Sequence, residues 1–124
     1  MLDILSVLND QLTGLGLNYE FGEMTQSPPV YPYWVGEYSE TDPGLGDGQE
    51  SPVILLTGFT RGSRLTLETQ KETIRDHFKH GVTALTPSKT SVSIFYSGSL
   101  PVPTDDIDLK KIQVNLQIKS WKGN

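Results

Sequence analysis

One stretch near the end of the chain constrains its fold more than any other. Ile112, Val114, Leu116 and Ile118 alternate with Gln, Asn, Gln and Lys without a break. Because successive side chains of a β-strand point to opposite faces, this alternation predicts a strand with one buried and one polar face, and Trp121 is a candidate for its continuation. A half-buried strand needs further strands beside it, so the chain is expected to build a sheet.

The composition favours a turn-rich protein with several short strands over a helical bundle. The 124 residues include 12 Gly and 8 Pro, and apolar residues make up 35%. A chain of this length is typical of one domain and can bury a single core without disulfides. We therefore expect one domain over residues 1–124.

The spacing of apolar residues assigns most of the remaining chain to helices and strands. Apolar residues at spacings of three and four predict amphipathic helices over 2–13 and 65–79. The segment 53–61 begins with four apolar residues, as expected of a central strand covered on both faces. The other predicted strands are 18–23, 33–38 and 91–97, and the predicted loops are 41–51 and 101–106.

The order of these elements is helix, three strands, helix, two strands. Strands gathered in blocks, with one helix before and one between them, predict an α+β fold. We expect a mainly antiparallel or mixed sheet of about five strands, with the two helices packed on one face. No internal repeat or linker divides the chain.

The charge and the residue types absent from the chain exclude several classes of protein. The formal net charge is −5, which argues against a general nucleic-acid binder because such proteins need a Lys/Arg surface. The absence of Cys excludes disulfides, thiolate catalysis and Cys-based metal sites. No basic n-region and no long apolar run is present, so we expect neither a signal peptide nor a membrane partner, and a soluble chain where it is made.

The candidate chemical groups lack the partners that their chemistry requires. His77 and His80 are three apart on the predicted second helix, but no third ligand stands at a recognisable spacing. The glycines of 44–48 do not lead into a helix, and acidic neighbours would repel phosphate. The acidic run 105–108 lacks the Gly and the bidentate Glu of an EF-hand. We therefore predict no catalytic, metal-binding or cofactor-binding residue, no cofactor and no enzymatic activity.

Two segments leave alternatives open. Residues 57–64 put two arginines and several hydroxyls just before a helix N-terminus, which suits a bound anion or a partner's carboxylate, and equally an ordinary strand-to-helix turn. Tyr33, Trp34 and Tyr38 are either side chains of the core or the pocket wall of a small ligand-binding domain or enzyme.

Charge is distributed unevenly along the chain. No Lys or Arg precedes Arg61, and an aromatic strand runs directly into an acidic loop. Such a loop is suited to becoming ordered against a neighbouring subunit. It could equally be a flexible solvated loop in a monomer. If the acidic first half of the chain and the second half, which holds all Lys and Arg, also separate in space, they favour a head-to-tail contact between subunits. The residues predicted to form a subunit or partner interface are Glu37, Glu40, Asp42, Asp47, Glu50, Arg61 and Arg64.

Two quoted segments carry a resemblance to a known family. PPVYPYWVGEYSE and VILLTGFTRGSRLTLETQKETIRDHF, with the acidic loop between them, resemble the small tail-completion proteins of long-tailed bacteriophages and prophages, and among these the tail terminator family. The resemblance covers most of the chain as an arrangement of elements: a helix, a proline-marked strand, a loop, a central strand, a helix and two closing strands. The family has no catalytic signature.

The resemblance implies an α+β fold and a structural role. Members form a hexameric ring that caps the finished tail tube at its head-proximal end and presents a face to the head connector. The implied partners are further copies of the chain, the tail-tube protein and head connector proteins, with DNA passing through the lumen without sequence-specific binding. The implied location is the bacterial host cytoplasm during assembly and then the tail or neck of the virion. A head–tail connector or other neck component is the alternative within the same virion.

Overall fold

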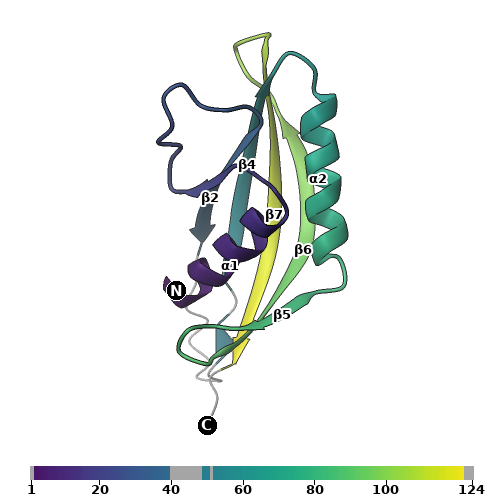
Figure 1. Cartoon of the computed structure of the whole chain (residues 1–124). Helices are drawn as coiled ribbons and strands as arrows, with labels where there is room; N and C mark the ends of the chain where they lie inside the picture. The colour runs from purple at the N-terminus through teal and green to yellow at the C-terminus, as the bar shows by residue number, and fades with distance from the viewer. Residues whose placement is uncertain (1, 40–48, 51, 122–124) are drawn as a thin grey trace.

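The computed structural model describes residues 2–39, 49–50 and 52–121, and Figure 1 shows how their elements are arranged. Within these residues, two α-helices and seven β-strands follow one another. In order they are α1 (Leu2–Gly14), β1 (Tyr19–Phe21), β2 (Tyr33–Ser39), β3 (Gln49–Glu50), β4 (Val53–Arg61), α2 (Leu65–Phe78), β5 (Val82–Leu85), β6 (Ser91–Val102) and β7 (Leu109–Trp121).

All of these strands belong to one mixed sheet. Six strands lie in the order β1-β2-β4-β7-β6-β5, and the short β3 pairs with the end of β7. The pair β1–β2 is parallel and the other pairs are antiparallel. The α+β class is confirmed, but the estimate of about five strands was too low. Both β3 and β5 escaped prediction because two and four residues are too short to show a clear period.

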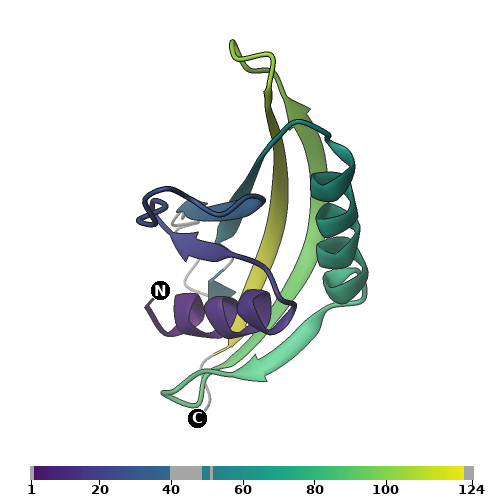
Figure 2. The ribbon, with the colours of Figure 1, turned by 45° about the horizontal axis from the view of Figure 1, so that its top comes forward.

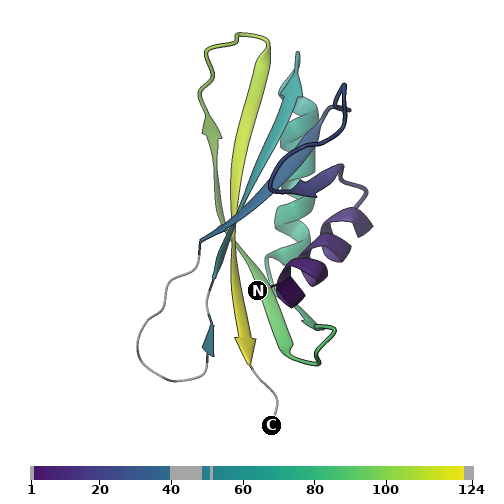
Figure 3. The same ribbon diagram turned by 90° about the vertical axis from the view of Figure 1, so that its left-hand side faces the viewer.

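Both helices lie on the same side of the sheet, as Figure 3 shows with the sheet seen nearly edge-on. Beneath them, buried apolar side chains of the helices and of the facing sheet surface form one cluster. Leu8 and Leu12 of α1, Ile74 of α2, and Leu56 and Leu116 of the sheet are all fully buried in it. The 3.6-residue period of the helices and the two-residue period of the strands thus meet in a single core.

The strand β4 corrects one expectation. Its burial alternates along the whole strand, with Ile54, Leu56 and Thr60 buried and Val53 and Leu55 only partly so. The prediction that β4 is covered on both faces was wrong. The apolar run lies in the centre of the sheet, but helices cover only one side of it.

The two long strands run further than the sequence pattern indicated. The sixth strand was predicted to end at residue 97, but a bulge between Tyr96 and Gly98 lets β6 continue to Val102. The seventh strand reaches Trp121, as its candidate extension suggested. A β-bulge shifts the alternation by one residue, so a strict two-residue period could not follow β6 across it.

Polar links fix the helices to the sheet and to each other. The Trp34 indole Nε1 donates a hydrogen bond of 2.8 Å to Oε1 of Gln70 on α2. The His77 ring lies 2.7 Å from Gln11 Oε1, which joins α2 to α1. The sheet also curls, so that β5 and the turn after it pass close to α1 (Figures 1 and 2). Ser88 of this turn donates a hydrogen bond to Asp3 of α1.

Candidate interaction surface

The side of the sheet away from the helices is uncovered in the described part of the chain (Figure 3). Residues paired across antiparallel strands share a face, so the strand register identifies the side chains on this surface, which we call the open face. Its apolar members are partly buried or exposed. They are Tyr33, Val35, Val53, Leu55, Phe59, Leu85, Phe95, Leu100 and Val102.

A polar row divides these apolar side chains into two groups. The row consists of Lys111, Gln113, Asn115, Gln117 and Lys119, the alternate residues of β7 that face away from the core. Asn115 lies at its centre, and its Oδ1 atom is shielded from solvent without a hydrogen-bond partner among the described residues. This one polar atom at the middle of the open face is therefore already shielded from solvent in the single subunit.

The two lysines of the row lie over aromatic rings. Lys111 Nζ is 5.1 Å from the Phe59 ring centroid, and Lys119 Nζ is 5.9 Å from that of Phe95. Phe59 in turn stacks on Tyr33, with centroids 4.8 Å apart. Long lysine stems cover apolar rings while their ammonium groups reach water. The open face therefore combines apolar area with positive charge at both ends of β7.

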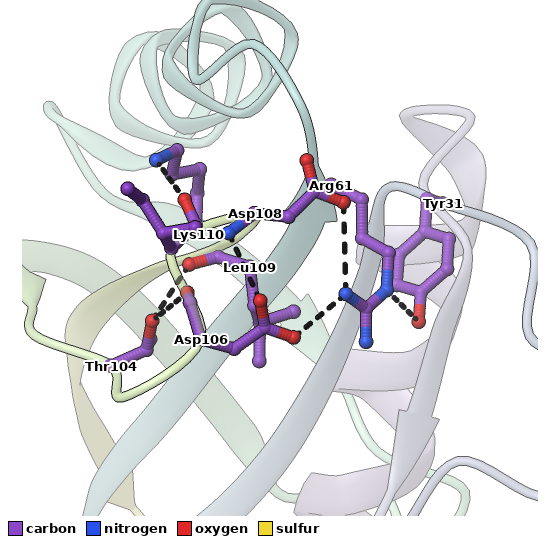
Figure 4. A network of polar contacts seen from close by, with 8 residues as sticks. Tyr31, Arg61, Thr104, Asp106, Asp108, Leu109 and Lys110 are labelled. Carbon is purple, nitrogen blue, oxygen red and sulfur yellow. Dashed lines mark hydrogen bonds and ion pairs between the residues drawn. The ribbon is translucent and has the colours of Figure 1, made fainter.

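At one end of the sheet, Arg61 connects β4 to the turn between β6 and β7 (Figure 4). Its Nη1 donates a hydrogen bond of 2.9 Å to Asp106 Oδ2 and lies 3.7 Å from Asp108 Oδ2. Its Nε donates to the Tyr31 hydroxyl at 3.3 Å. Charge-assisted bonds of this kind are directional, so one guanidinium holds three segments of the chain together.

The turn is further ordered by its own hydrogen bonds (Figure 4). Thr104 Oγ1 donates to the carbonyl oxygens of Asp106 and Leu109, at 2.6 and 2.9 Å. The Asp108 backbone N–H donates to Asp106 Oδ1 at 3.0 Å, and Lys110 Nζ donates to the Ile107 carbonyl at 2.7 Å. Bonds from Arg61 and then from Asp108 lower the pKa of the Asp106 carboxyl, and the same pairing raises the pKa of Arg61. The acidic run 105–108 thus belongs to a structured turn.

The structure separates the predicted interface residues. Glu37 is exposed on the open face opposite Leu55, whereas Arg61 lies six residues further along β4, roughly 20 Å away at ~3.3 Å per residue. Arg64 is exposed just before α2, and Glu50 lies in β3 opposite Ser120. The remaining predicted residues, Glu40, Asp42 and Asp47, lie outside the described residues. Within one subunit, therefore, Glu37 and the two arginines do not form a common site.

The three aromatic side chains of the alternative hypothesis do not line one pocket. Trp34 is fully buried beneath α2, while Tyr38, on the same face of β2, is exposed and stacks on Phe21 with centroids 5.9 Å apart. Tyr33 lies on the other face of the strand. A hollow of about 240 Å³ is found elsewhere, against the turn between β6 and β7. Its lining residues are Arg64, Val102, Pro103, Thr104, Asp106, Ile107, Leu109 and Lys110.

The remaining candidate groups have structural partners. His77 contacts Gln11 and packs edge-on against Phe78, and Arg61 is held by carboxylates of its own chain. Across the described ranges, no group of three or more His, Asp or Glu side chains is gathered closely enough to hold a metal ion. Within the same ranges, no helix is long and apolar enough to span a membrane.

Sequence reasoning missed the open face itself. The clue was available in the two adjacent central strands: three outward positions of β4 are apolar (Val53, Leu55 and Phe59), whereas the outward residues 111–119 of β7 are amides and lysines. A surface-exposed sheet usually carries polar residues on its outward face, so the apolar outward positions of β4 indicate a surface that meets something.

Comparisons with known proteins report on the fold. No family model matches the chain, and no curated protein sequence matches it. Eighteen chains of solved structures match. One of them, described only by a sequence identifier, superposes with a TM-score of 0.67 at 14% sequence identity, over 93% of this chain and 88% of its own. At that identity, the likeness establishes a shared fold and nothing about activity or partners.

Proposed function

We propose that this chain is a structural tail-completion protein of a long-tailed phage or prophage, which forms a ring at the head-proximal end of the tail tube. The open face is the observation that carries the proposal. It displays Tyr33, Leu55, Phe59, Leu85 and Leu100 without helices over them, on a chain that also has a well-formed core. Monomeric proteins rarely leave a large apolar patch exposed, and sheets with one apolar uncovered face typically pair with another surface.

The order of elements supports the same proposal. The chain runs from a helix through a proline-flanked strand, a central strand and a second helix to a long closing hairpin. This is the arrangement on which the resemblance to tail terminators rests. In this role the protein works through its surfaces: it binds copies of itself, the tail-tube protein below and the head connector above, and it lets DNA pass through the lumen. It is made in the bacterial host cytoplasm and ends in the tail or neck of the virion.

The proposal is tested by measuring mass with light scattering behind a sizing column, over a wide range of protein concentration. A shift from the 13.7 kDa monomer to a discrete larger species is expected, and electron microscopy then counts the subunits of the ring. The same measurement is repeated with tail tubes of the phage or prophage that carries the gene. Rings that bind the head connector but not the tubes would identify a neck component. A mass fixed at the monomer, with and without tubes, would contradict ring formation.

A further inference from the structure

We infer that the subunits associate head to tail, with the open face of one copy packed on the opposite, acidic side of the next copy. This inference rests on the proposed ring and names the two surfaces that would build it. The second surface, which we call the acidic layer, consists of α1, β1 and residues 22–32. Of these, α1 and residues 22–32 lie on the side of the sheet away from the open face (Figure 3). The edge strand β1 turns Phe21 to that side, whereas Glu20, paired with Val35, is turned to the open face.

The acidic layer has only one sign of charge. The described residues 2–39 contain five acids and no Lys or Arg. Three of the five lie on the side away from the open face and are exposed or partly exposed: Asp3, Asp10 and Glu23. Because a protein surface usually mixes both signs, a layer of acids alone creates a field that favours a cationic partner.

The open face has the complementary character. Lys111 and Lys119 stand at the two ends of its polar row, and Glu20 and Glu37 are the acids on its β1–β2 side. Both lysines lie over aromatic rings and are thus held at the surface.

Charge also decides how two copies can meet. If two open faces packed together about a two-fold axis, the lysines at the ends of one β7 would face those of the other. Two acidic layers would likewise oppose acid with acid. The front-to-back arrangement brings the lysines of one copy to the acids of the next. A front-to-back contact is heterologous, and when its rotation closes it generates a ring.

Apolar side chains on both surfaces complement this pattern. On the acidic layer, Leu2 is 83% exposed, Val30 64% and Phe21 42%. On the open face, Leu85 is 67% exposed and Leu100 46%. Burial of such side chains stabilises an interface, while the surrounding charges set its orientation.

A charge swap tests the contact. The variant K111E/K119E reverses the open face, and D10K/E23K reverses the acidic layer. We expect each variant alone to remain monomeric at concentrations where the wild type assembles. An equimolar mixture should recover assembly, because each reversed surface then meets its complement on the other variant. Native mass spectrometry should find the two variants in equal numbers in the recovered species.

A matched control carries the same change of charge elsewhere. In R75E/K79E two cations outside both surfaces, one on α2 and one directly after it, become acids, and this variant should assemble like the wild type. Thermal unfolding of all variants checks that each is folded. Assembly of K111E/K119E like the wild type, or a mixture that stays monomeric, would overturn the contact while leaving a ring built in another way intact.

Nuclear magnetic resonance gives a readout that does not require a closed ring. Raising the concentration of ¹⁵N-labelled wild-type protein should shift the amide signals of β7 and of α1 together, and added salt should reverse both shifts. Shifts confined to one surface would indicate a two-fold contact and would overturn the inference, as would a complete absence of shifts. Shifts on both surfaces without a discrete ring would instead support the contact and contradict the ring.

Discussion

Trp34 on β2 and Gly58 on β4 are paired across the sheet, and the Trp34 ring occupies the space where a larger residue at position 58 would place its side chain. A Cβ atom on Gly58 would lie 2.7 Å from the Trp34 ring and 2.8 Å from Leu67. The indole therefore depends on this glycine for its place beneath α2, where Nε1 reaches Gln70.

Gly58→Ala is expected to destabilise the fold by about 1–3 kcal/mol, the range for overpacking a filled core. The free energy of unfolding from urea titration measures the change. Gly14→Ala is the matched control, because a Cβ there meets no atom within 4 Å. That substitution lies in the last residue of α1 and should be neutral or stabilising by up to about 1 kcal/mol. Equal costs at the two positions would contradict the packing of Trp34 against Gly58.

The Gly58 contact illustrates what the sequence could reveal. The two-residue period of the predicted strand 33–38 agrees with Trp34 and Tyr38 sharing a face opposite Tyr33, and the helical period of 65–79 agrees with the burial of Leu67. These are local regularities of a strand and a helix. The close approach of Trp34 to Gly58 depends on which strands become neighbours, and no pattern within either strand encodes that.

The same limit applies to the candidate surface. Its members come from strands that are far apart in the sequence, and their common exposure follows from both helices packing on the other side of the sheet. Arg61 was predicted as an interface residue from its place before a helix. Its actual partners, Tyr31 and Asp106, are 30 and 45 residues away and meet it only in the folded chain.

Tyr19→Phe is expected to leave the fold intact and to raise its stability by up to about 1 kcal/mol. The Tyr19 hydroxyl is buried and has no hydrogen-bond partner among the described residues, so its removal relieves a desolvation cost. Urea titration at pH 7 measures the difference. A loss of more than about 1 kcal/mol would show that the hydroxyl has a partner in solution.

The Tyr19 phenol also makes the stability of the fold depend on pH in the alkaline range. Burial raises the pKa of Tyr19 from 10.0 to about 12 in the folded protein. Below pH 10 the phenol is neutral in both states, so it adds no pH dependence to the stability. Between pH 10 and 12 it ionises in the unfolded chain first, so stability falls. We expect the wild type to lose stability over this window more steeply than Tyr19→Phe. Parallel pH profiles of the two proteins would contradict the burial of an un-ionised phenol.

Asp106→Asn is expected to loosen the turn between β6 and β7 without unfolding the protein. The substitution removes the charge that Arg61 holds, while the turn's other hydrogen bonds remain. Hydrogen exchange of the Leu109 and Asp108 amides should become faster, whereas the β7 core amides should not change. Asp105→Asn is the control, since Arg61 pairs with Asp106 and Asp108 and not with Asp105.

Acid should reproduce the effect of that substitution in the wild type. The pKa of Asp106 is lowered below its ordinary value of 3.8, so its contribution is present above that value and is lost as the pH falls through the lowered pKa. In strong acid, hydrogen exchange of the turn amides should therefore increase more in the wild type than in Asp106→Asn, once the intrinsic pH dependence of exchange is subtracted. An identical acid response in both proteins would indicate that the Arg61 contact does not order the turn.

Leu55 and Leu56 provide the sharpest test of the open face, because they are adjacent in β4 and point to opposite sides of the sheet. Leu56 is fully buried in the core, and Leu55 is partly exposed next to Asn115 of the polar row. Leu56→Ala should cost about 2–5 kcal/mol of unfolding free energy by leaving a cavity. Leu55→Ala should cost the monomer much less, because its side chain is only partly removed from water. If the open face is the surface through which copies associate, Leu55→Ala should nevertheless weaken self-association, measured by light scattering under conditions where the variant is fully folded. A Leu55→Ala protein that assembles with the affinity of the wild type would show that this part of the open face stays outside the interface, whatever surface the subunits use.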